Sequence, residues 1–186
     1  MRAISCPGHS FVPEFKIKQT MNNTSTYSHQ IKIEAVTIGS IKALTINDNG
    51  TNANIGEKLT KLFEEVIEAM KKENANFAGA PFAIYHKVVH NPDGSMEFTF
   101  EAGIPVDQKV KSSGRVNYRE LQGGKAVKAD HYGKHEDTAQ THMLMDAWMK
   151  KNNNKVIGAP WESYVTDPRK EPDSSKWLTQ IFYPVA

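Results

Sequence analysis

The sequence predicts an α+β fold built from two similar halves in tandem, and two observations carry this prediction. The motif Gly-Ala-Pro-aromatic-x-x-Tyr occurs twice, from Gly79 to Tyr85 and again from Gly158 to Tyr164. An amphipathic helical pattern precedes each copy at the same offset of 79 residues. A chain of 186 residues also suits one domain or two small halves that share a core.

In the first half, β-branched and alternating residues predict strands over 31–36 and 40–46. A helix over 56–72 follows from an apolar stripe spaced i, i+3, i+4, made of Leu59, Leu62, Phe63, Val66, Ile67 and Met70. Strands over 82–88 and 96–102 flank the turn signal Asn91-Pro92-Asp93-Gly94.

The second half repeats this order. Strands are expected over 104–109 and 125–131, then a helix over 135–151, then strands over 161–166 and 177–183. The stripe of the second helix is less regular and consists of Ala139, Thr141, Leu144, Met145 and Trp148. Each half is thus a strand–strand–helix–strand–strand module. A pseudo-twofold axis would relate the two, with a ligand cleft between them.

Charge and composition narrow the function classes. Residues 1–28 are expected to be poorly ordered and carry the whole net charge of +2, so residues 29–186 are neutral overall and direct nucleic-acid binding is not expected. We place the halves at about 29–103 and 104–186, and Met21 is an alternative start. No apolar run is long enough for a membrane span, and the single cysteine excludes an internal disulfide. The cytoplasm is the expected compartment.

One difference between the halves points to a functional group. Glu162 stands where the first half has Ala83. Because side chains alternate along a strand, Glu162 should share a face with Tyr164, while Trp161 points to the other face. On the surface, Glu162 would be a solvated charge. Enclosed among aromatic rings, it would attract a lipophilic cation or act as a general acid or base.

The histidines give weaker signals. His131 and His135 are four residues apart but straddle the end of a strand and the start of a helix, which is not the geometry of a helical metal pair. His86 and His90 are expected to be ordinary strand or surface residues. We therefore expect no metal and no cofactor.

Three segments together resemble a known family: 129–133 (Ala-Asp-His-Tyr-Gly), 158–168 (Gly-Ala-Pro-Trp-Glu-Ser-Tyr-Val-Thr-Asp-Pro) and 177–185. The sequence is similar to the GyrI-like small-molecule-binding family, also called the bacterial transcription activator effector-binding domain, over residues 29–186. The resemblance implies a tandem fold with a ligand cleft, in which Glu162 meets cationic ligands. The ligand-binding residues it suggests are Glu162, Tyr85, Tyr164, Trp161, Phe82 and Tyr132.

The resemblance leaves three functions open. The first is stand-alone binding or sensing of a hydrophobic, cationic, aromatic small molecule. The second is hydrolysis of a strained, cyclopropane-type toxic compound, with Glu162 as the catalytic base. The third is interaction with a protein partner such as DNA gyrase. One cleft could serve all three, so the sequence does not decide among them. Binding rather than catalysis is the leading hypothesis, because a single carboxylate is placed asymmetrically in a duplicated strand.

Overall fold

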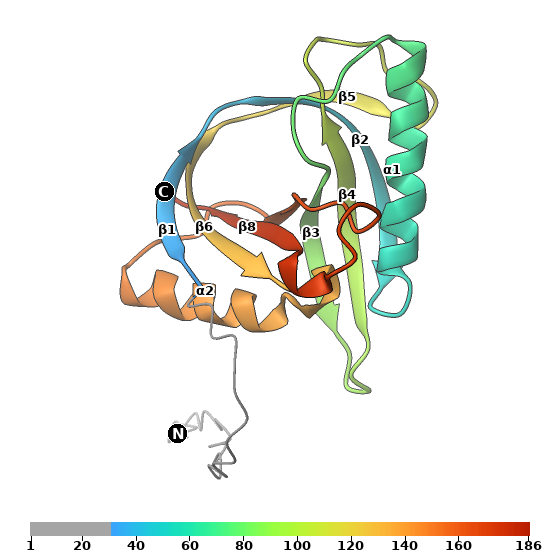
Figure 1. The fold of residues 1–186 in the computed structure, drawn as a ribbon. Helices are drawn as coiled ribbons and strands as arrows, with labels where there is room; N and C mark the ends of the chain where they lie inside the picture. The colour runs from blue at the N-terminus through green and yellow to red at the C-terminus, as the bar shows by residue number, and fades with distance from the viewer. Residues whose placement is uncertain (1–30) are drawn as a thin grey trace, which may run out of the picture.

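The computed structural model describes residues 31–186, in which eight strands form one antiparallel sheet that curls into a half-barrel (Figure 1). The strands follow the spatial order β1-β6-β8-β7-β3-β4-β2-β5. The elements are β1 (Ile33–Ile38), β2 (Ile41–Thr51), α1 (Ile55–Lys72), β3 (Phe82–His90), β4 (Met96–Pro105), β5 (Asn117–Leu121), β6 (Gly124–Tyr132), η1 (His135–Asp137), α2 (Ala139–Lys151), β7 (Trp161–Tyr164), η2 (Ser174–Lys176) and β8 (Leu178–Pro184). The predicted N-terminal segment 1–28 lies outside the described residues.

The predicted duplication is present in this order of strands. Read from either edge of the sheet, the sequence of elements is the same when β1 is equated with β5, β2 with β6, β3 with β7 and β4 with β8. The two halves meet where β3 pairs with β7, and Ala83 lies opposite Glu162 there. The halves therefore share one continuous sheet, and the junction between them is a pair of hydrogen-bonded strands.

The first strand of each half belongs to the sheet of the other half. β1 pairs with β6, and β5 pairs with β2. The two crossing connections pass close together, because a Cβ atom added to Gly123 would lie 2.4 Å from the carbonyl oxygen of Ile38. Only glycine allows this approach of two backbones.

Both helices cover the convex outer face of the sheet, which we call the helix face, and the opposite side is the concave face (Figure 1). Under α1 the core contains Leu44, Val66 and Phe100, and under α2 it contains Val127, Met145 and Ile181, joined in each case by neighbouring apolar residues. The stripe predicted for α1 is buried or partly buried. In α2, Leu144 is exposed, contrary to the expected stripe.

One predicted strand is wrong. The segment 104–109 was expected to begin the second half, but Ile104 and Pro105 end β4, and the strand that begins the second half is β5. The chain leaves the sheet after Val106 because the Asp107 carboxylate accepts hydrogen bonds from the backbone and side-chain amides of Asn76. β5 contains Arg119 and Glu120, and charged residues are typical of an edge strand.

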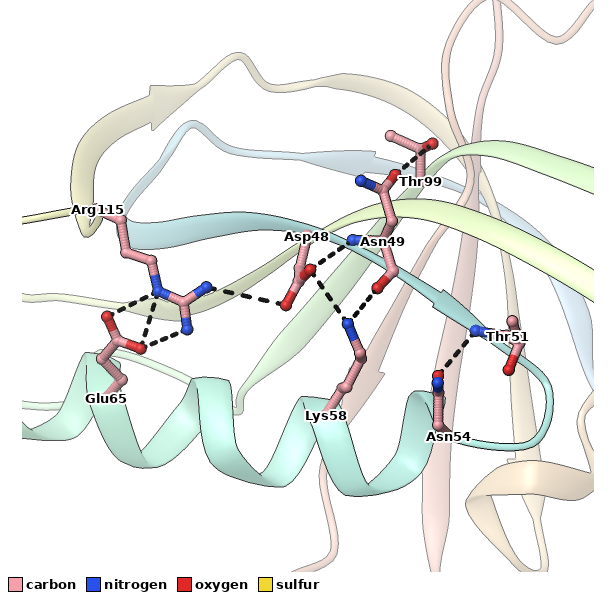
Figure 2. Close-up of polar contacts among 8 residues, drawn as sticks. All are labelled: Asp48, Asn49, Thr51, Asn54, Lys58, Glu65, Thr99 and Arg115. Carbon is pink, nitrogen blue, oxygen red and sulfur yellow. Dashed lines mark hydrogen bonds and ion pairs between the residues drawn. The ribbon is translucent and has the colours of Figure 1, made fainter.

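Polar contacts fasten α1 to the edge of the sheet (Figure 2). Lys58 donates to the Asn49 carbonyl at 2.6 Å and lies 3.4 Å from Asp48. Arg115, on the segment that leads into β5, makes a two-pronged contact with Glu65 of the helix. These contacts fix the position of the helix above the first half. Neither helix of residues 31–186 has the apolar length that a membrane crossing requires.

Candidate functional site

Glu162 lies on the helix face at the junction of the two halves, and its residue is only 3% exposed. The sheet register places Ala83 directly beside it on β3. Tyr85 and Tyr164, the tyrosines of the two repeated motifs, follow two positions later on their strands and share this face. The predicted alternation along β7 is therefore confirmed.

Three side chains hold the Glu162 carboxylate. Oε2 accepts from the hydroxyls of Tyr85 at 3.1 Å and Tyr164 at 3.0 Å, and these two hydroxyls are 3.0 Å from each other. Oε1 lies 2.9 Å from Nε2 of His142 on α2. Nδ1 of the same His142 ring lies 2.8 Å from the Tyr183 hydroxyl. No arginine or lysine pairs with this carboxylate among the ion pairs of residues 31–186.

Burial changes the pKa values of the tyrosine hydroxyls. Burial raises the pKa of Tyr85 and of Tyr164 well above the usual value, and the negative charge of Glu162 raises both further. Burial, with nearby carboxylates, also raises the pKa of Tyr183 to about 12. All three hydroxyls therefore stay protonated at neutral pH and remain hydrogen-bond donors.

Aromatic side chains close the site from both halves. Phe63 of α1 contacts the Tyr164 ring edge-on, with ring centroids 6.0 Å apart. From the other side, His135 packs edge-on against Tyr164, and Trp177 stacks on His135, each at 5.3 Å. Burial lowers the pKa of His135, which favours its neutral form. A ligand that reaches Glu162 must displace some of these covers.

The other predicted site residues lie elsewhere. Phe82 and Trp161 project from the concave face, where their rings meet edge-on at 6.1 Å and Trp161 stacks on Phe182 at 4.0 Å. Tyr132 ends β6 opposite Leu178, is 51% exposed, and belongs by alternation to the concave side. The structure thus brings Tyr85 and Tyr164 to Glu162, and it separates Phe82, Trp161 and Tyr132 from it by the sheet.

A second carboxylate is buried on the concave face. Glu101 of β4 is fully enclosed, and its Oε2 accepts from Arg119 of β5 and from His86 Nε2, the latter at 3.1 Å. Its Oε1 makes no hydrogen bond with residues 31–186, although rotation of the nearby Thr45 hydroxyl would direct that donor toward it. Burial alone would raise the pKa of Glu101, but Thr45, Arg119 and His86 outweigh burial and lower it.

Glu162 lines neither of two hollows on the surface of residues 31–186. One, of about 340 Å³, is polar and lies near the start of α1, with Asn49, Asn54 and Thr99 in its wall. Asn54 and Thr99 already engage neighbours there, since Asn54 accepts the backbone amide of Thr51 and Thr99 donates to Asn49 (Figure 2). The other, of about 420 Å³, lies on the concave face.

The histidines that could suggest a metal site are used in internal hydrogen bonds. His131 contacts the Thr141 hydroxyl and the Lys134 carbonyl, and His135 contacts the Thr179 hydroxyl. Within residues 31–186, no three side chains of the usual metal-binding kinds gather in one place.

Sequence reasoning missed His142, Tyr183 and the whole Glu101 cluster. The 79-residue offset could have found His142, because it equates His142 with Phe63, and the structure places His142 against Glu162 and Phe63 against Tyr164. The same offset equates Glu101 with Gln180, so Glu101 is a second charge that the duplication does not share.

Comparisons with known proteins agree with this architecture. A sequence model described as the GyrI-like small molecule binding domain matches residues 30–186. No protein of curated function matches the sequence significantly. The C-terminal domain of EcmrR has a similar fold, with a TM-score of 0.75 and 18% identity over 84% of this chain and 98% of that one.

Two further structures share the fold at low identity. A hydrolase encoded by lin2189 of Listeria innocua gives a TM-score of 0.57 and 16% identity, over 83% of this chain and 92% of that one. SAV2435 bound to tetraphenylphosphonium gives 0.55 and 16%, over 83% and 94%. The chain also covers 57% of the EcmrR chain in a complex with DNA, with a TM-score of 0.73 and 19% identity.

Proposed function

The chain belongs to the GyrI-like small-molecule-binding family, and from its geometry we propose that it binds a lipophilic, cationic, aromatic molecule at Glu162. The observation that carries the proposal is a buried carboxylate that pairs with no lysine or arginine of residues 31–186. Two tyrosine hydroxyls and the His142 ring make its hydrogen bonds. A buried charge without a counter-ion favours an incoming cation.

The surroundings suit the apolar part of such a ligand. Tyr85 and Tyr164 contact the carboxylate, and Phe63 and His135 pack against the Tyr164 ring. Aromatic faces attract flat or quaternary cations. SAV2435, which shares the fold, is bound to tetraphenylphosphonium in its structure. That cation is therefore a suitable probe for this chain.

Binding requires the site to open. Because Phe63 and the His135–Trp177 stack cover Tyr164, we propose that the ligand enters by displacing the segment that precedes β8, which includes Trp177. Part of the binding free energy then offsets the loss of these contacts, so affinity should be lower than for a preformed pocket.

Calorimetric titration with tetraphenylphosphonium tests the proposal. We expect saturable binding to the wild type, and a loss of about 2 kcal/mol or more in Glu162→Gln, which is about 30-fold in Kd. The neutral triphenylphosphine oxide should bind both proteins weakly and equally. Equal affinity of the two proteins for the cation would refute the role of Glu162.

A second candidate function rests on His142. A carboxylate that contacts a histidine, which is itself held by the Tyr183 hydroxyl, is an arrangement able to accept and pass on a proton. We propose hydrolysis of a strained electrophile as the alternative, with Glu162 as base. Turnover that disappears in both Glu162→Gln and His142→Phe would favour it, and binding without product would exclude it. A partner such as DNA gyrase stays a prediction.

A further inference from the structure

The hollow on the concave face has the size and lining of a small-molecule site. It measures about 420 Å³, which lies within the usual range for ligand pockets. Apolar side chains from both halves make most of its wall, among them Ile41, Ile84, Leu121, Trp161 and Pro184. Glu162 lies across the sheet from it, because Trp161 and Glu162 are neighbours on β7 and point to opposite faces.

Packing holds the wall of this hollow in place. The Trp161 ring stacks on Phe182 with centroids 4.0 Å apart, and Phe82 meets it edge-on. The two crossing connections, which also border the hollow, approach too closely for any side chain at Gly123 (Figure 1). The hollow is therefore formed before a ligand arrives, so binding here does not require the opening that the helix-face site needs.

The lining favours an uncharged ligand. It contains no aspartate or glutamate of residues 31–186. Lys125 borders the hollow, but alternation along β6 places its side chain on the helix face with Val127. The exposed Gln122 side chain makes no hydrogen bond with residues 31–186, so nothing there fixes its amide. A charged group placed against these apolar walls would lose its hydration without gaining a counter-ion.

His86 is the polar side chain of the lining that a partner holds in place. Its Nε2 lies 3.1 Å from Oε2 of the buried Glu101. The pKa of Glu101 is lowered, so its carboxylate is ionised at neutral pH and can only accept, which means that Nε2 carries a proton. Nδ1 of His86 makes no hydrogen bond with residues 31–186. The carboxylate thus orients the ring and leaves Nδ1 available to a ligand.

We propose that the concave hollow binds an uncharged aromatic alcohol, whose rings lie against Trp161 and Ile84 and whose hydroxyl group hydrogen-bonds to Nδ1 of His86. A hydroxyl suits either protonation state of the ring, because it can donate to a bare nitrogen and accept from a protonated one. A hydrocarbon of the same shape would make the apolar contacts and lack the hydrogen bond. This site goes beyond the function proposed for Glu162 and does not depend on it.

Equilibrium dialysis with 2-naphthol and 2-methylnaphthalene tests the proposal. The two compounds have the same shape, and the methyl compound is the more hydrophobic, so a surface that is merely apolar would prefer it. We expect one saturable site for 2-naphthol and binding of 2-methylnaphthalene that is weaker by about fivefold or more. Equal affinities, or tighter binding of the hydrocarbon, would overturn the proposal.

A matched pair of histidine variants tests the hydrogen bond. His86 and His90 are both exposed residues of β3, and His90 does not line the hollow. His86→Phe should weaken 2-naphthol binding by about fivefold or more without weakening that of 2-methylnaphthalene, a difference that a loss of packing would not produce. His90→Phe should change neither. Equal effects of the two variants on 2-naphthol would overturn the role of His86.

A pair of alanine variants locates the site. Ala159→Leu fills the hollow, whereas Ala80→Leu makes the same change at the equivalent position of the first motif, outside the lining. We expect the first to weaken both compounds by about fivefold or more and the second to weaken neither. Equal effects within this pair would overturn the location. The histidine pair keeps the test valid if Ala159→Leu fails to fold, because both histidines are exposed.

Competition separates this site from the one proposed at Glu162. Saturating tetraphenylphosphonium should leave 2-naphthol bound, because the sheet lies between the two sites. Displacement of 2-naphthol by the cation would place the alcohol on the helix face and overturn the proposal. Dialysis of 2-naphthol alone needs no cation, so failure of either proposal leaves the other to be judged by its own measurement.

Discussion

The two buried glutamates, one on each face of the sheet, are held in different ways. Glu162 receives hydrogen bonds from two tyrosines and a histidine, whereas Glu101 is paired with Arg119. In both cases the other half of the duplicated chain has an uncharged residue, Ala83 or Gln180. The guanidinium of Arg119 compensates the charge of Glu101, whereas no arginine or lysine of residues 31–186 pairs with Glu162. Burial of a carboxylate is therefore not enough to indicate a cation-binding site, because the residues that pair with it determine whether its charge is already compensated.

The largest expected effect comes from breaking the ion pair. Arg119→Ala leaves Glu101 buried without its cation, and we expect the free energy of unfolding to fall by about 3 kcal/mol, at the low end for buried pairs because Arg119 is half-exposed. Urea denaturation at pH 7 measures it. The double variant Arg119→Ala/Glu101→Gln should recover most of the loss. If Arg119→Ala lowers the free energy of unfolding less than Glu162→Gln does, the two glutamates are not held in the different ways described above.

A smaller effect is expected from removing one neutral donor. Tyr164→Phe deletes a hydroxyl that contacts both Glu162 and Tyr85, and should lower the free energy of unfolding by about 1–1.5 kcal/mol. Tyr118→Phe is the matched control, because Tyr118 packs against the same core and its hydroxyl makes no hydrogen bond within residues 31–186. Equal losses in the two variants would show that the hydroxyl network adds nothing to stability.

The smallest effect concerns pH. The folded-state pKa of Glu101 is lowered, so its contribution to stability is complete above the unfolded-state pKa of about 4.3 and is lost as the pH falls through the folded-state value. Glu101→Gln should therefore flatten the decline of unfolding free energy below about pH 4. Urea denaturation between pH 7 and pH 3 measures this slope. An unchanged acid slope would mean that Glu101 does not titrate differently in the folded state.

Much of the fold could be predicted because short repeated sequence motifs reveal the duplication. The duplicated motif and the local apolar patterns predicted both helices, seven of the eight strands of residues 31–186 and the position of Glu162 between two tyrosines. Strand alternation also placed Trp161 on the opposite face. β5 was missed because its sequence, Asn-Tyr-Arg-Glu-Leu, lacks the apolar pattern of a buried strand.

The partners of both acids could not be predicted from spacing. His142 reaches Glu162 from another element, and Arg119 reaches Glu101 only because β5 joins the sheet of the first half. Such contacts depend on how distant segments pair, which periodicity does not encode. The hollow on the concave face could not be predicted for the same reason, since its wall combines both crossing connections with residues from seven strands of the sheet.

The exchange of β1 and β5 means that neither half is complete when separated at about residue 104. In a fragment of the first half, β1 would have no β6 to pair with, and the edge of β2 that pairs with β5 would be unpaired. Two copies of that fragment could satisfy each other by trading strands, as in a domain-swapped homodimer. The single chain thus has the geometry of a covalently fused pair, in which each half carries a buried acid that the other half does not share.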